Sequence, residues 1–251
     1  MSLFPSSHSS IAAAADALVS RMPHALWRAS QMASLGSAVT SSGIATLDRE
    51  LPGGGWPRSA LIELLLAQPG IGEMQLLRPA LTVLARQGRI ALLQPPHAPQ
   101  VAAWSAWGLP YERLLWIKTA RSADALWSAE QILRNGSCGA LIFWQSQVRP
   151  QALRRLQLAA QACDTTLWMM RPLAQAQDAS PAPLRLALRP APAGIRITLF
   201  KRRGPPRDDV LFVPLAGLPA ASPFSTTSHH ASVDRRALAA IAAGNLASAL
   251  V

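Results

Sequence analysis

The sequence predicts an α/β protein with a doubly wound, mostly parallel sheet, helices on its flanks and an antiparallel hairpin at one edge. Between residues 43 and 203, short apolar runs alternate with stretches of helical spacing, as the crossover units of a parallel sheet require. The runs are almost continuously apolar, which is typical of strands buried on both faces. Two later runs alternate polar and apolar residues, which indicates strands with one solvated face.

Each predicted element has its own local signal. Leu76, Leu77 and Leu81 share one face of a helix that Gly88 is placed to end, and an Asn-Gly pair is placed to end the next helix. The predicted strands cover residues 60–66, 89–93, 114–117, 140–144 and 165–170, followed by a hairpin of 184–188 and 194–200. The predicted helices cover residues 76–84, 124–134 and 151–162.

The two ends of the chain differ in composition from the core, which we place at residues 41–214. Residues 1–40 are rich in Ser and Ala and contain a predicted helix at 11–21. Residues 215–251 are rich in Pro, Ser and Ala, and we predict a linker followed by a helix at 232–250. No Lys or Arg precedes the first helix, and the long uncharged runs contain prolines, so we expect neither a signal peptide nor a membrane span.

Composition narrows the class of protein and of partner. Half of the 251 residues are hydrophobic, which excludes a fully disordered chain. Two distant cysteines with no CxxC spacing argue against a structural zinc site and a disulfide scaffold. The formal charge is +11, and residues 149–207 hold eleven basic and two acidic side chains, a net charge of +9. A nucleic acid, an acidic protein surface and a solvated face all remain open as explanations.

The loop that follows the first predicted strand is where a fold of this class usually binds phosphate. Its position and glycines match a P-loop, GxxxxGK followed by Ser or Thr, whose Lys neutralises phosphate and whose hydroxyl binds magnesium. Here Gly70 and Gly72 are present, Ala67 stands at the first Gly, and Glu73 and Met74 replace the Lys and the hydroxyl. A carboxylate repels phosphate and a thioether is a poor magnesium ligand, so we expect no nucleotide cofactor.

An ordered set of short motifs runs through the core, roughly over residues 24–214. The segments are SGIATLD (42–48), LPGGGWPR (51–58), ALIEL (60–64), GIGE (70–73), PPH (95–97), LWSAEQ (126–131), LRNG (133–136), RRLQLAA (154–160), SPA (180–182), LRL (184–186) and KRRG (201–204). The first of them resemble the opening of the RecA ATPase core. The whole set more closely resembles the ImuA family, the RecA-like accessory proteins of bacterial SOS mutagenesis. The resemblance implies a RecA-like fold.

Two further chemical positions of the RecA pattern are replaced. Trp144 stands where a strand should end in a magnesium-holding carboxylate, and Pro96 stands where a Glu should polarise the attacking water. Together with Glu73 and Met74 in the loop, these replacements remove three requirements of phosphoryl transfer. We therefore expect a protein that is not an enzyme, with no catalytic residue, no cofactor and no metal.

Basic residues at two places are candidates for a partner or nucleic-acid surface. They are Arg149, Arg154 and Arg155 around the start of the third helix, and Lys201, Arg202, Arg203 and Arg207 after the hairpin. The two loops that hold single-stranded DNA in RecA-type filaments correspond to residues 145–150, which are few, and 173–180, which lack basic and aromatic side chains. We therefore expect a protein-docking surface first and weak, non-specific DNA binding second.

The ImuA resemblance implies a scaffold in translesion DNA synthesis. Its direct partner would be an ImuB-type, catalytically inactive Y-family polymerase homologue, with an error-prone replicative-type polymerase and the sliding clamp reached indirectly. RecA is a further candidate partner, because residues 201–206 resemble the stretch through which a RecA protomer reaches its neighbour's nucleotide, although a solvated turn also fits them. We expect a cytoplasmic protein that joins the nucleoid during DNA damage. Two alternatives stay open: a cell-division inhibitor resembling SulA, a shorter relative of the same RecA-like group, and a modulator of RecA filaments.

Overall fold

The computed structural model describes residues 38–202 and 209–215 of the chain. The predicted helices at 11–21 and 232–250 lie outside these residues, as do Arg203 and Arg207. None of the described helices is both long enough and apolar enough to cross a membrane.

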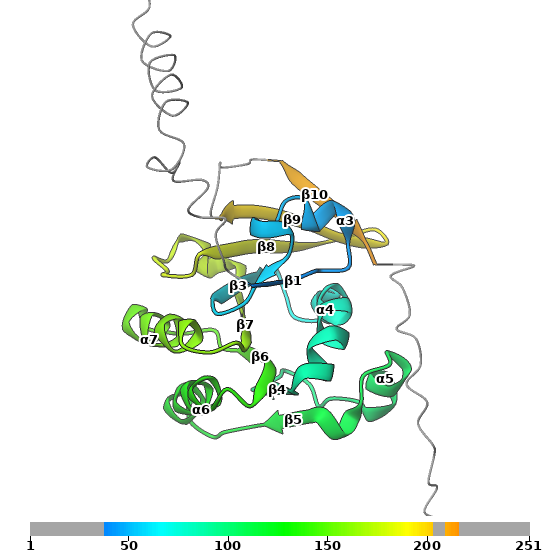
Figure 1. The fold of residues 1–251 in the computed structure, drawn as a ribbon. Helices are drawn as coiled ribbons and strands as arrows, with labels where there is room; N and C mark the ends of the chain where they lie inside the picture. Colours follow the sequence, from blue (N-terminus) through cyan, green and yellow to red (C-terminus); the bar gives the residue numbers. More distant parts are fainter. Residues whose placement is uncertain (1–37, 203–208, 216–251) are drawn as a thin grey trace, which may run out of the picture.

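An eight-stranded sheet forms the centre of the molecule, with the strand order β10-β9-β8-β3-β7-β6-β4-β5 (Figure 1). Neighbours from β5 to β8 are parallel, whereas β9 and β10 are antiparallel additions at one end. The strands are β3 (Leu61–Leu66), β4 (Arg89–Leu93), β5 (Leu114–Ile117), β6 (Cys138–Trp144), β7 (Thr166–Pro172), β8 (Leu184–Ala191), β9 (Gly194–Lys201) and β10 (Val210–Pro214). The predicted fold class is confirmed, including the five core strands and the β8–β9 hairpin.

The three predicted helices are also confirmed. They are α4 (Glu73–Gln87), α6 (Ser122–Asn135) and α7 (Pro150–Gln161), and Gly136 ends α6 in the left-handed conformation with φ 62°. Helix α4 covers one face of the sheet, and α6 and α7 cover the other (Figure 1). Elements that the sequence analysis does not predict are β10, the short sheet of β1 (Val39–Thr40) and β2 (Trp56–Pro57), the helices α3 (Ala45–Asp48) and α5 (Val101–Ala106), and the 3-10 turns η1 (Pro52–Gly54), η2 (Tyr111–Arg113) and η3 (Leu173–Gln177).

The central strand β3 divides two hydrophobic cores, because successive side chains of a strand point to opposite faces. Ile62 and Leu64 pack into the core beneath α4, and Leu61 packs into the core beneath α6 and α7. All six residues of β3 are buried. Each buried leucine contributes roughly 1.5–3 kcal/mol of transfer free energy, so this strand anchors both layers of helices.

Several residues of the sequence motifs hold the start of β3 in place. The Gln157 side chain on α7 accepts a hydrogen bond from the Leu61 N–H at 2.8 Å. Trp56, just before β3, is fully buried and packs edge-to-face against Trp168 on β7, with the ring centroids 5.9 Å apart. These motif positions therefore stabilise the fold itself.

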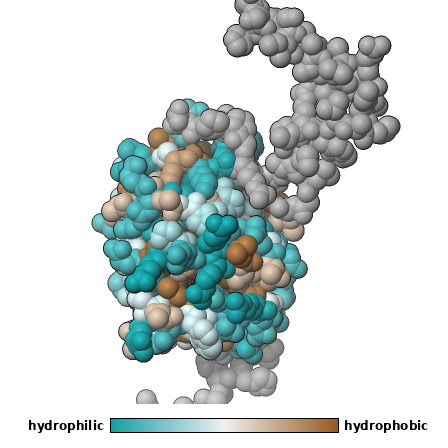
Figure 2. All heavy atoms as spheres, turned by 90° about the vertical axis from the view of Figure 1, so that its left-hand side faces the viewer, coloured by the Kyte–Doolittle hydropathy of each residue, from teal (hydrophilic) through white to brown (hydrophobic). Residues whose placement is uncertain are grey.

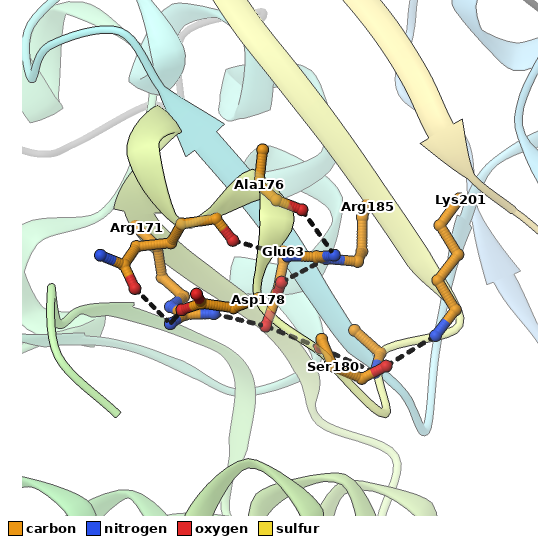
Figure 3. Close-up of polar contacts among 9 residues, drawn as sticks. Glu63, Arg171, Ala176, Asp178, Ser180, Arg185 and Lys201 are labelled. Carbon is orange, nitrogen blue, oxygen red and sulfur yellow. Dashed lines mark hydrogen bonds and ion pairs between the residues drawn. The ribbon is translucent and has the colours of Figure 1, made fainter. Parts of the chain in front are cut away.

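Glu63 is the one charged residue of β3, and its side chain is fully buried. Its carboxylate accepts hydrogen bonds from Arg185 Nε at 2.6 Å and from the Ser180 hydroxyl at 2.8 Å, and it pairs with Arg171 at 3.3 Å (Figure 3). A buried charge is strongly unfavourable unless it is paired and hydrogen-bonded. Here both carboxylate oxygens are engaged.

The two arginines of this Glu63 cluster reach onward to the η3 segment. Arg171 pairs with Asp178 at 3.1 Å, and Arg185 donates to the main-chain carbonyls of Gln175 and Ala176 at 3.1 and 3.2 Å (Figure 3). Two guanidinium groups thus face two carboxylates. The cluster fastens the connection between β7 and β8 onto the sheet.

Candidate functional site

The loop between β3 and α4 occupies the position of a phosphate-binding loop. Gly70 and Gly72 have φ angles of 83° and 105°, a left-handed conformation that favours glycine, and α4 begins directly afterwards at Glu73. The N-terminus of such a helix carries unpaired N–H groups and a partial positive charge, which attract anions. The local backbone therefore has the form that the sequence predicts.

Glu73 places its own carboxylate in this loop. The side chain is only 3% exposed, and Oε1 accepts a hydrogen bond from the Gly70 N–H at 2.9 Å. Oε2 is buried and has no hydrogen-bond partner among the described residues. The internal carboxylate thus uses a loop amide that a bound phosphate would need, and its charge repels phosphate.

Apolar side chains surround the same loop. Leu215, just after β10, lies so close to Gly72 that a Cβ there would overlap its side chain. A depression of about 360 Å³ remains, and its walls include Met74 and Trp107 as well as Glu73. It is lined by Gly70, Ile71, Gly72, Glu73, Met74, Gln75, Trp107 and Leu215, with no cationic residue among them.

A second pocket, of about 230 Å³, lies on the other side of the loop at the carboxyl ends of β3, β6 and β7. It brings together Ala67, Pro96 and Trp144, the other three positions of the predicted degenerate site. Arg171 is the one charged residue among those that line it. The lining offers no carboxylate to hold magnesium or to polarise water. The positions of the predicted site are therefore divided between two separate pockets.

Comparison with known proteins relates the chain to a cell division inhibitor. No protein-family model matches the chain. Over 122 residues the chain is 30% identical to the cell division inhibitor SulA of Edwardsiella piscicida, a match that spans 46% of this chain and 70% of that protein. The chain belongs to the SulA family. The relation to SulA that the motifs imply is thereby confirmed, whereas the resemblance to the ImuA family stays a prediction.

The candidate basic residues of this SulA-family protein fall into two groups at opposite edges of the sheet. Helix α7 follows β6, so Arg149, Arg154 and Arg155 lie near the carboxyl edge of the parallel strands. Strand β9 runs antiparallel to β8, so Lys201 and Arg202 at its end lie near the amino edge. The structure therefore does not join the two groups into one surface.

Three of these basic side chains already have partners within the protein. Arg155 pairs with Glu130 at 2.6 Å, and this hydrogen bond raises the pKa of its guanidinium group. Arg202 donates to the Glu50 carbonyl at 2.6 Å, and Lys201 donates at 2.7 Å to a carbonyl of the η3–β8 connection. The side of the molecule that carries α6 and α7 is mostly hydrophilic, with separate hydrophobic patches (Figure 2).

The buried charges of the SulA-family core were not predicted from the sequence. Arg171 and Arg185 belong to the basic segment 149–207, yet both lie inside the protein beside Glu63. The net charge of that segment therefore overstates the charge that a partner meets. One signal for this arrangement was visible, because Glu63 is a single carboxylate within an apolar run and needs a buried cation.

Proposed function

We propose that this SulA-family protein has a role in the SOS response to DNA damage and acts as a non-catalytic, RecA-like scaffold of translesion DNA synthesis. The observation that supports it best is the Glu73 carboxylate inside the former phosphate loop. In this loop the Glu73 carboxylate occupies a main-chain amide, the neighbouring side chains are apolar, and no cation lines the depression. Such a loop is suited to packing rather than to phosphoryl transfer. The function then lies in binding other proteins.

The direct partner in this proposal is an ImuB-type polymerase homologue, as the ordered motifs suggest. An error-prone replicative-type polymerase and the sliding clamp would be reached through that partner. RecA is a further candidate partner, and weak DNA binding would come from the exposed arginines at the start of α7. The expected location is the cytoplasm, with recruitment to the nucleoid during DNA damage.

The first test is nucleotide binding and turnover by the full-length protein. Isothermal titration with ATP and magnesium is expected to give no binding heat, and phosphate release is expected to match the buffer blank. ATP turnover by the parent protein that disappears in the Gly72→Ala and Glu73→Ala variants would contradict the proposal that the protein is non-catalytic. A melting curve for each variant separates a lost site from a lost fold.

The second test is co-purification of the full chain with the ImuB-type protein from cells that express both. Retention of the partner at 150 mM salt, with loss of damage-induced mutagenesis when the gene is deleted, supports the scaffold. Failure to retain the partner in both tag orientations contradicts it.

A second candidate function is inhibition of cell division, which the match to the cell division inhibitor SulA favours. Overexpression distinguishes the two candidates. Long filamentous cells with blocked division rings support the inhibitor. Normal division, together with mutagenesis that depends on the gene, supports the scaffold.

A further inference from the structure

The end strand of the sheet, β10, has one backbone edge with which none of the described strands pairs. In an antiparallel pair, residues alternate between those that bond to the partner strand and those whose N–H and C=O point away. The Leu215 N–H donates to the Ala193 carbonyl at 3.1 Å. Because the pattern repeats every second residue, the N–H and C=O groups of Val213 and Leu211 also point toward β9. The N–H and C=O groups of Val210 and Phe212 then point outward, where none of the described strands pairs with them.

The outward residues of β10 are also apolar and exposed. The Val210 side chain is 57% exposed and that of Phe212 is 47% exposed. Edge strands usually carry charges, bulges or a cover that prevents further pairing, whereas β10 itself has no charged residue; Asp209 stands just before it and Pro214 at its end. The edge strand at the other end of the sheet, β5, is flanked on both sides by basic residues.

Two arginines lie beside this edge on the face away from α4. Arg196 on β9 lies directly between Phe212 on β10 and Arg189 on β8. Like charges directly opposite each other in a sheet are destabilising. Both arginines are exposed, and neither forms a hydrogen bond or an ion pair within the part of the chain that the structure describes. A carboxylate placed above them would remove the repulsion.

We propose that β10 binds an extended, acidic and apolar segment of a partner protein by strand addition. The backbone of the segment bonds to Val210 and Phe212, its apolar side chains cover theirs, and an acidic side chain reaches past Phe212 to pair with Arg196. A second copy of this chain fits less well, because its own β10 contains no carboxylate to pair with Arg196 and its Asp209 lies outside the strand. The inference assigns a binding surface to the proposed scaffold and rests on that function only for the partner's identity.

The test uses fluorescence anisotropy of the full-length protein with a labelled Val-Thr-Glu-Thr-Val peptide, about the length of β10, which places Val and Glu on the same face of the added strand. The same peptide with Lys in place of Glu is the control probe. The acidic peptide is expected to bind, to weaken with salt, and to protect the Val210 and Phe212 amides from hydrogen exchange. Equal binding of the two peptides overturns the inference, as does binding that leaves both amides unprotected.

Two variants probe the backbone and the charge separately. Val210→Pro removes an outward N–H without touching the β9 pairing, and Arg196→Glu reverses the charge. Each is expected to weaken acidic-peptide binding at least about tenfold, whereas Arg113→Glu, beside β5, leaves binding unchanged. Circular dichroism of each variant confirms the fold. Parent-like affinity in folded Val210→Pro, or single-stranded DNA binding that depends on Arg196 in place of peptide binding, overturns the inference.

The outcome is separable from that of the scaffold proposal. If the ImuB-type protein co-purifies equally with parent and Val210→Pro, the scaffold stands and the assigned edge is wrong. If the acidic peptide binds β10 but the ImuB-type protein is not retained, the edge stands and the scaffold proposal is wrong.

Discussion

Glu63 within β3 and Glu73 at the start of α4 are two buried carboxylates on the elements that one loop connects, and their surroundings differ. Two arginines and a hydroxyl surround the oxygens of Glu63, and these partners come from β7, β8 and the segment between the two strands. Glu73 has a single loop amide three residues away, and one oxygen without a described partner. The first carboxylate joins distant parts of the chain, and the second organises only its own loop.

Burial alone therefore does not determine how much each of the two residues contributes to stability. Removing one member of a buried, charged network leaves the other charges unpaired, which is far more costly than losing one hydrogen bond to a loop amide. The Glu63 cluster should therefore dominate stability. The Glu73 loop should matter mainly for what the site excludes.

The largest expected effect is that of Glu63→Ala. Arg171 and Arg185 would stay buried without their shared carboxylate, so the free energy of unfolding should fall by about 3–5 kcal/mol. Urea denaturation measures it, with exposed Glu112→Ala as the matched control, expected to stay within about 0.5 kcal/mol. A loss below about 1 kcal/mol for Glu63→Ala would show that Glu63 contributes no more to stability than Glu73 is expected to.

Arg185→Met should have the next largest effect. The variant loses the 2.6 Å pair with Glu63 and two hydrogen bonds to η3, but Glu63 keeps Arg171. We expect a loss of about 2 kcal/mol in the free energy of unfolding and faster hydrogen exchange in residues 173–180. Arg189→Met, on the exposed face of the same strand, is the control. Unchanged exchange in that segment would show that Arg185 does not hold it.

Glu73→Gln should have a smaller effect, because the amide oxygen can still accept the Gly70 hydrogen bond. Loss of the charge at the start of α4 should lower the free energy of unfolding by about 0.3–1 kcal/mol. Addition of ATP and magnesium is expected not to raise the melting temperature of this variant. A clear rise would indicate that the carboxylate alone keeps the nucleotide out.

Arg155→Ala should have the smallest effect. Its side chain is 63% exposed, so its ion pair with Glu130 is screened by solvent, and the loss in the free energy of unfolding is expected to be smaller than for the other three variants. Urea denaturation at low and at 1 M salt checks this, since the difference from the parent protein should shrink at high salt. A loss as large as that of Arg185→Met would mean that this surface ion pair stabilises the protein as much as the Arg185 contacts of the buried cluster do.

The fold was predictable because its signals are local. Apolar runs identify β3, β4 and β6, and leucine spacing identifies α4, so the parallel sheet follows from the periodicity of the chain. The degenerate loop was predictable for the same reason, since its residues are contiguous. Glu73 was predicted to repel phosphate, but its hydrogen bond to the Gly70 amide depends on side-chain geometry that spacing does not encode.

Features that depend on distant parts of the chain were not predictable. The Glu63 cluster joins residues more than a hundred positions apart, so the basic residues near the hairpin seemed to be surface charges. Strand β10 was missed because pairing with the distant β9, and not a local signal, decides its conformation. The contact of Leu215 with Gly72 also joins distant parts of the chain, and the sequence near either residue does not predict it.

That contact bears on how such a protein could change over evolutionary time. Restoring a lysine and a hydroxyl at positions 73 and 74 would leave the leucine of position 215 against the loop, and would leave Trp144 and Pro96 at the neighbouring strand ends. Each of these changes by itself leaves the other obstacles in place. Phosphate binding at this loop would therefore need several substitutions at once, so single substitutions are not expected to create it.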